Sequence, residues 1–148
     1  MLGLQGSHDV YTKISSDLNM FAVHNGPDSI RTAFSANASR QDMMDTYLRG
    51  FHEPVKAGVD SIMVAYSGIN GIPCNANAEL LTSILKDKWN FKGMAFSDNG
   101  GVVDLYKAQH YAMNLTDAAA LALNAGLDQV RQPQPDHLYC RSMLTFRT

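Results

Sequence analysis

Short apolar runs alternate with helical patterns along this chain. The runs NMFAV (19–23), SIMVAY (61–66) and GMAFS (93–97) are apolar almost throughout, and LDQV (127–130) is a shorter fourth run. Strands that are covered on both faces have this composition, whereas strands with one face in water alternate apolar and polar residues. The pattern therefore predicts about four buried strands.

Helical periodicity separates these runs. Asn77 is the expected N-cap of the helix at 77–89. Thr116 is the expected N-cap of the helix at 116–126, and Gly126 is its expected end. Strand–helix alternation favours parallel strands with right-handed crossovers. The three segments with apolar residues at helical spacing are 39–58, 77–89 and 116–126.

The first helix carries both a clear start and a conflict. Ser39, with Asp42 three residues later, has the spacing of a capping box, and Gly58 suits the C-terminal end. Pro54 lies inside the same pattern. A proline in a helix interior costs about 3 kcal/mol, so we expect a kink at Pro54 or a broken last turn.

The fold class expected is α/β, either an open doubly wound sheet or part of a (β/α)₈ barrel. In both, chemistry collects at the carboxyl ends of the strands. The segments that follow the first three runs are rich in Gly, Asn, Asp and Pro: HNGPD (24–28), SGINGIP (67–73) and DNGG (98–101). Such loops suit a ligand site, but the same residues form plain turns.

Composition narrows the function classes. The chain has 148 residues, 45% of them hydrophobic and 18% charged, with a formal net charge of -2. Without a basic cluster, nucleic-acid binding is not expected, and no apolar stretch is long enough to span a membrane. The first residues lack the pattern of a signal peptide, and localisation stays undetermined.

Cys74 and Cys140 are expected to be free thiols, and the five histidines lack metal-ligand spacing, so neither a metal nor a cofactor is predicted.

Five segments carry a resemblance when they are taken in order: LGLQG (2–6), AVHNGPD (22–28), SIMVAYSGINGIPCNAN (61–77), ELLTSILKDKWNFKGMAFSDNGG (79–101) and DAAALALNAGLD (117–128). Together they resemble glycoside hydrolase family 3, particularly its β-glucosidase and β-xylosidase branch, over about residues 2–128. The resemblance implies part of a (β/α)₈ TIM-type barrel domain with about four parallel strands over residues 1–130. The tail over 131–148 is expected to be irregular for a different reason, because Pro133 and Pro135 break regular structure and no period follows.

The resemblance implies a retaining mechanism on a β-linked glucoside or xyloside. In such enzymes a carboxylate forms a covalent glycosyl-enzyme, and a carboxylic acid about 5–5.5 Å away protonates the leaving oxygen. Asp98 matches the nucleophile. Tyr66 matches a tyrosine that donates a hydrogen bond to that carboxylate, Met63 matches a residue lining the sugar pocket, and Arg31 stands where this branch often has an arginine.

Some positions depart from the family pattern. Asn19 and Met20 stand where the family has a Lys-His pair that binds sugar hydroxyls, Asn99 follows the nucleophile position in place of Trp, Tyr or Cys, and Ser67 replaces a common Asn. These departures favour, as an alternative, a non-catalytic sugar-binding or degenerate member. An unrelated α/β protein that binds phosphate is the third hypothesis, although no phosphate-loop motif is present.

The expected barrel is incomplete. A (β/α)₈ barrel takes about 250 residues, and the family's acid/base Glu comes from a second domain. Glu53 and Glu79 fall on predicted helices away from the strand ends, so neither is assigned that role. We expect little turnover by the chain alone, and self-association or poor stability because of open barrel edges.

Overall fold

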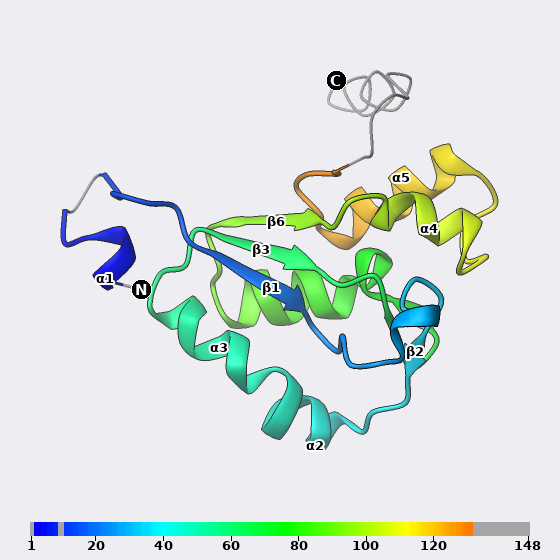
Figure 1. Ribbon diagram of the computed structural model, residues 1–148, viewed down its shortest axis with the longest axis horizontal. Coiled ribbons are helices and arrows are strands. Elements are labelled where there is room, and N and C mark those ends of the chain that lie inside the picture. The colour runs from blue at the N-terminus through cyan, green and yellow to red at the C-terminus, as the bar shows by residue number, and fades with distance from the viewer. Residues whose placement is uncertain (1, 9–10, 132–148) are drawn as a thin grey trace.

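A parallel three-stranded sheet forms the centre of the molecule. The computed structural model describes residues 2–8 and 11–131. Its main sheet has the strand order β1 (Asp17–Phe21), β3 (Ser61–Val64) and β6 (Met94–Ser97), and all three strands run in the same direction (Figure 1). The predicted α/β class and the parallel arrangement of the strands are confirmed.

The expected fourth strand at 127–130 is reduced to a single parallel bridge between Phe96 and Gln129. The main chain of this segment still follows β6, because the Asp128 N–H donates to the Ala95 carbonyl at 2.8 Å and the Ser97 N–H donates to the Gln129 carbonyl at 2.9 Å. The Asp128 carboxylate accepts from the Ala95 N–H at 2.9 Å. A side chain therefore occupies the place where a regular ladder would have a main-chain acceptor.

The helical connection from β1 to β3 comprises α2 (Arg40–Asp42), η2 (Met43–Tyr47) and α3 (Arg49–Lys56). The Ser39 hydroxyl accepts from the Asp42 N–H at 3.1 Å, and the Asp42 carboxylate accepts from the Ser39 N–H, so the predicted capping box is present. Of the two outcomes expected at Pro54, the broken last turn is wrong, since α3 continues through Pro54 to Lys56. The irregular stretch is η2, where the Leu48 N–H donates five residues back to the Met43 carbonyl.

The next two helices also start close to the predicted residues. Asn77 accepts from the Leu80 N–H at 3.0 Å ahead of η4 (Glu79–Lys88), as expected for a capping side chain. The cap of α5 (Leu115–Ala125) is Asn114, which accepts from the Asp117 N–H, and the prediction of Thr116 was wrong. Both are polar residues next to the apolar pattern, and the sequence does not distinguish them. Gly126 ends α5 with a φ of 106°, as predicted.

Short elements that the sequence pattern does not predict surround the carboxyl end of the main sheet. Strand β4 pairs parallel to β2 and antiparallel to β5 in a second small sheet. Helix α4 begins directly after the loop that follows β6, and η3 precedes η4 (Figure 1). These elements are η1 (Asp28–Ile30), β2 (Ser35–Ala36), β4 (Gly68–Ile69), β5 (Ile72–Pro73), η3 (Cys74–Ala76) and α4 (Gly101–Lys107). Helix α1 (Leu2–Gln5) is also unpredicted and lies at the amino end of the sheet, where Gln5 donates to the Gly58 carbonyl ahead of β3 (Figure 1).

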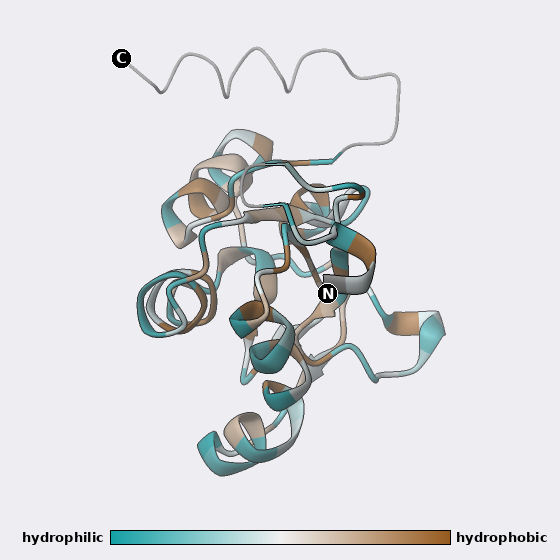
Figure 2. Cartoon of the chain, turned by 90° about the vertical axis from the view of Figure 1, so that its left-hand side faces the viewer, coloured by the Kyte–Doolittle hydropathy of each residue, from teal (hydrophilic) through white to brown (hydrophobic). Residues whose placement is uncertain are grey.

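The two faces of the main sheet have different surroundings. Ile62, Val64 and Ala95 point into the core shared with the helices and are fully buried. On β1, Asp17 and Asn19 are exposed on the opposite face. Seen end-on, the helices are mostly hydrophilic outside and hydrophobic towards the interior (Figure 2). The sheet therefore has a helix-covered face and an opposite, open face, which is exposed at Asp17 and Asn19 of β1 but buried at Met63 of β3 and Phe96 of β6.

Candidate active site at the carboxyl ends of the strands

Asp98 and Tyr66 lie at the same end of the sheet. Asp98 directly follows β6, and Tyr66 is the second residue after β3. Val64 and Ser97 are register partners in the parallel β3–β6 pair, so both strands end at one level. The half-buried Asp98 and the buried Tyr66 therefore meet at the carboxyl edge, where the parallel pattern places them.

The Tyr66 hydroxyl is bonded to the turn that carries Asp98. It donates to the main-chain carbonyl of Asn99 at 2.8 Å. Burial raises the pKa of the Tyr66 phenol, and the negative charge of the Asp98 carboxylate and a hydrogen bond with it raise it further, whereas Arg31 acts in the opposite direction. A hydroxyl has one hydrogen to donate, so rotation about the C–O bond is enough to exchange Asn99 for Asp98 as acceptor.

The Asp98 carboxylate is also held by its own turn. Its Oδ1 accepts from the Asn99 N–H at 2.6 Å, and its main-chain carbonyl accepts from the Gly101 N–H at 3.0 Å. Gly100 has a φ of 82°, a left-handed conformation that glycine adopts without steric cost. The DNGG segment (98–101) is therefore a tight turn, which is one of the two structures that its composition predicts. The same turn carries the Asp98 carboxylate at the strand end.

Arg31 and His24 complete a cluster around the Tyr66 ring. The Arg31 guanidinium lies 5.5 Å from the ring centroid and forms an ion pair with Asp28 at 3.1 Å. The His24 ring centroid lies 6.4 Å from that of Tyr66, and His24 is exposed. A cation over an aromatic face is an attractive contact. The segment after β1 thus supplies two cationic or polar side chains to the edge where Asp98 lies.

Met63 lies deeper in the sheet than this cluster. It is buried on β3 and pairs with Phe96 on β6, so the two side chains share a face. The Arg131 guanidinium lies over the Phe96 ring at 5.7 Å on that face. The structure therefore places Met63 on the open face of the sheet, below the edge that carries Tyr66.

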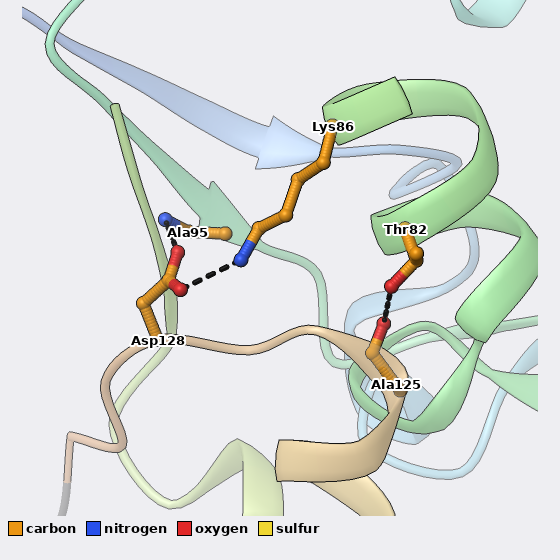
Figure 3. Close-up of polar contacts among 5 residues, drawn as sticks. All are labelled: Thr82, Lys86, Ala95, Ala125 and Asp128. Atoms are coloured by element: carbon orange, nitrogen blue, oxygen red, sulfur yellow. Dashed lines mark hydrogen bonds and ion pairs between the residues drawn. The ribbon is translucent and has the colours of Figure 1, made fainter. Parts of the chain in front are cut away.

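The strand that leads to Asp98 is held by the segment after α5. The Asp128 carboxylate accepts from the Ala95 N–H and forms an ion pair with Lys86 of η4, whose Nζ lies 2.6 Å away (Figure 3). Nearby, the Thr82 hydroxyl donates to the Ala125 carbonyl at 2.9 Å (Figure 3). One carboxylate therefore links a helix to β6 three residues before Asp98.

The positions that depart from the family pattern lie beside the site. Asn19 and Met20 of β1 line a cavity of about 510 Å³ together with His24 and Tyr47. Met20 packs partly against the core, and Asn19 is exposed on the open face. Ser67, by contrast, is fully buried and donates to the Val23 carbonyl at 2.7 Å, so it joins two strand ends without facing the site.

Four residues near this edge were not assigned from the sequence. His24 directly follows the first apolar run at 19–23, and that position is the signal in the sequence that could have marked it. Asn75 and Gln109 donate to main-chain carbonyls at the end of β3, and burial raises the pKa of Asp104 on α4. These contacts join segments that are far apart in the chain, so no local sequence pattern predicts them.

Within residues 2–8 and 11–131, neither an acid/base carboxyl group nor a metal centre is assigned. Glu53 forms an ion pair with Lys56 at 3.1 Å on α3, and Glu79 lines a separate cavity of about 430 Å³. No cluster of three or more His, Cys, Asp or Glu side chains is placed to hold a metal ion in this part of the chain. Cys74 is a buried free thiol whose pKa is raised to about 11 by burial, and Cys140 lies outside the described residues.

Comparisons with known proteins identify the family. The model of the glycosyl hydrolase family 3 N-terminal domain matches residues 1–140. A xylan 1,4-beta-xylosidase of Xylanibacter ruminicola is 36% identical over 129 residues, which are 85% of this chain and 15% of that protein. A probable beta-D-xylosidase of Arabidopsis thaliana is 39% identical over 99 residues, 66% of this chain and 13% of its own. The chain belongs to glycosyl hydrolase family 3.

Solved structures agree with this assignment. A family 3 exo-beta-xylosidase in complex with a xylobiose aziridine probe superposes with a TM-score of 0.79 at 29% identity, over 87% of this chain and 18% of that one. A beta-glucosidase of Erythrobacter marinus gives a TM-score of 0.85 at 25% identity, over 98% of this chain and 20% of that one. The described residues thus adopt part of the N-terminal (β/α)₈ barrel of the family, and the chain spans about a fifth or less of the length of these relatives.

The predicted tail at 131–148 lies outside the described residues, apart from Arg131. In the part of the chain that the structure covers, no helix has both the length and the apolar character needed to cross a membrane.

Proposed function

We propose that this chain carries the nucleophile side of a retaining β-glycosidase site, with Asp98 as the nucleophile. The observation that supports it most is the position of Asp98 at the carboxyl end of β6, with the Tyr66 hydroxyl bonded to the adjacent carbonyl. A carboxylate that is held by hydrogen-bond donors at a strand end is suited to attack the anomeric carbon. The names of its relatives indicate a β-xyloside or β-glucoside as substrate.

The other residues of the cluster have proposed parts in this reaction. Tyr66 donates to the Asp98 carboxylate before attack, and rotation of its hydroxyl returns the bond to Asn99 once the ester has formed. Arg31 lies over the Tyr66 ring and extends positive charge and donors towards sugar hydroxyls. Met63 is not part of the cluster; it is buried on β3 below Tyr66 and supplies an apolar contact from there.

The reaction needs a proton donor that the described residues do not supply. We therefore propose that the chain alone forms the glycosyl ester only with a sugar whose leaving group departs without protonation. A 2-fluoro xyloside or glucoside with a dinitrophenolate leaving group meets that condition. Asp98 Oδ attacks C1, the C1–O bond breaks, dinitrophenolate leaves as the anion, and fluorine slows hydrolysis of the ester.

The test is a peptide map by mass spectrometry after incubation of the full chain with this reagent. We expect the sugar on the peptide that contains Asp98, no label in Asp98→Asn, and a label at the same place in Asp104→Asn, which removes a nearby half-buried carboxyl group. A label on another carboxylate, or a label in wild type that persists in Asp98→Asn, would contradict the assignment. An aryl β-xyloside without an activated leaving group should give little turnover.

A sugar-binding role without catalysis is the second candidate. Asn19 and Met20 occupy the positions of the family's Lys-His pair, and Met20 packs partly against the core. Loss of one charge-assisted contact to a sugar hydroxyl costs about 1.5–3 kcal/mol. Saturable binding of xylose or glucose by wild type and Asp98→Asn alike, with no label at Asp98, would favour this function over the first.

Self-association through open barrel edges is also proposed. The edge of β1 that faces away from β3 lacks a strand partner among the described residues, and the open face exposes Asp17 and Asn19. Unpaired strand edges are templates for pairing with another chain. Size-exclusion chromatography with light scattering should detect dimers or larger species, and a compact stable monomer would count against this proposal.

A further inference from the structure

Two side-chain amides bind consecutive carbonyls just beyond the end of β3. The Asn75 Nδ2 group donates to the Ala65 carbonyl at 3.0 Å, and the Gln109 Nε2 group donates to the Tyr66 carbonyl. Asn75 comes from η3, ten residues after Ala65, and Gln109 lies two residues past the end of α4. Two distant segments therefore hold the peptide that carries Tyr66.

Both amides keep these contacts at a cost. Asn75 Oδ1 and Gln109 Oε1 are buried and have no hydrogen-bond partner among the described residues. Buried polar atoms are nearly always bonded, and an unsatisfied one costs about 1–3 kcal/mol. An apolar side chain in either place would avoid that cost but would leave the carbonyl at the end of β3 without its donor. The donors are therefore the part of each amide that the site uses.

The same two residues also touch the structure around Asp98. Asn75 packs under the start of α4, where a Cβ on Gly101 would lie 3.1 Å from Asn75 Nδ2. The Gln109 N–H donates to the Asp104 carbonyl at 2.8 Å, which fixes Gln109 to the end of α4. Each amide thus connects the end of β3 to the loop and helix that follow β6.

We propose that Asn75 and Gln109 are positioning residues, which fix the Ala65–Tyr66 main chain so that the Tyr66 hydroxyl reaches the Asp98–Asn99 turn. This inference rests on the proposed role of Asp98 for its effect on catalysis, but not for its effect on Tyr66. Misplacement of a reacting group by about 1 Å can reduce a rate roughly a hundredfold. Loosening of Tyr66 should therefore lower the rate at which Asp98 is labelled, and should not merely lower the unfolding midpoint.

The experiment compares Gln109→Met, which keeps the side-chain length and removes the amide, with Gln41→Met, the same change on the exposed surface of α2. Three quantities are measured on the full chain: the rate of labelling by the 2-fluoro sugar, the unfolding midpoint, and the alkaline titration of Tyr66. The titration is followed by NMR of ¹³C-tyrosine, with Tyr66→Phe to assign the signal.

Gln109→Met should slow labelling roughly tenfold or more and lower the pKa of Tyr66, because the phenol loses burial and moves away from the Asp98 charge. Gln41→Met should change neither. If Gln109→Met only lowers the unfolding midpoint, with an unchanged rate and Tyr66 titration, the inference is overturned. If Gln109→Met does not fold, Asn75→Ser is held to the same two outcomes. If wild type is not labelled at all, the proposed function fails, and the Tyr66 titration alone still decides between the positioning role and its absence.

Discussion

Asp128 offers the sharpest test of how β6 is held. Its carboxylate accepts from the Ala95 N–H at 2.9 Å and from Lys86 at 2.6 Å (Figure 3). Ala95 is fully buried, so Asp128→Ala leaves its N–H without its acceptor. The side chains of Lys86 and Asp128 are 28% and 38% exposed, so their ion pair is partly screened by solvent.

The expected magnitude follows from these two contacts. An orphaned buried N–H costs about 1–3 kcal/mol, and a partly exposed ion pair contributes about 0.2–1 kcal/mol. We therefore expect Asp128→Ala to lower the free energy of unfolding by about 1–4 kcal/mol, or the Tm by roughly 2–16 °C. Lys86→Met removes only the ion pair and should cost less than about 1 kcal/mol.

The assay is urea unfolding at pH 7, followed by the fluorescence of Trp89, for wild type and both single variants. Asp128→Asn is the third variant: its amide oxygen can still accept from the Ala95 N–H, whereas its NH₂ group meets Lys86, so its stability should lie between wild type and Asp128→Ala. Equal losses in Lys86→Met and Asp128→Ala would refute the reasoning, because they would assign the whole effect to the ion pair.

Three further predictions concern other parts of the chain. Gly93→Ala should lower the free energy of unfolding by about 2 kcal/mol or more, since its Cβ would lie 2.2 Å from the Asp60 carbonyl oxygen, and a loss under half of that in urea unfolding would contradict the close approach. Ser39→Ala should cost about 1 kcal/mol in the same assay by removing the capping box with Asp42, and an unchanged midpoint would mean that the box contributes nothing. Because the pKa of Tyr66 is raised in the folded state, its contribution to stability is intact below the ordinary tyrosine pKa and is lost as pH rises through the folded value; Tyr66→Phe should flatten this alkaline decline in thermal melts, and an identical decline in both proteins would refute it.

The elements that were predicted well are those with a local physical cause. The apolar runs at 19–23, 61–66 and 93–97 became the three parallel strands, and Ser39 caps its helix through a contact three residues away. Helix α4 has only seven residues and begins after a glycine turn, too little for periodicity to show. The two-residue strands of the small sheet have no pattern at all.

The candidate site was predictable to a lesser degree. The parallel pairing brings Tyr66 and Asp98 to one edge, as the strand pattern with the family resemblance implied. The contacts of Asn75 and Gln109 join residues 10 and 43 positions apart, and depend on how the loops fold over the strand ends. Their amides are identical in sequence to any solvent-facing Asn or Gln, so only the structure distinguishes them.

The main chain at 128–131 has a consequence for designing shorter versions of this protein. The Asp128 N–H, the Gln129 carbonyl and the Arg131 carbonyl are bonded in turn to Ala95, Ser97 and Gly100. Truncation after Gly126 would remove all three partners and leave β6 as a bare edge beside Asp98. A shorter version that keeps these bonds must therefore reach at least Arg131, although α5 ends six residues earlier at Ala125.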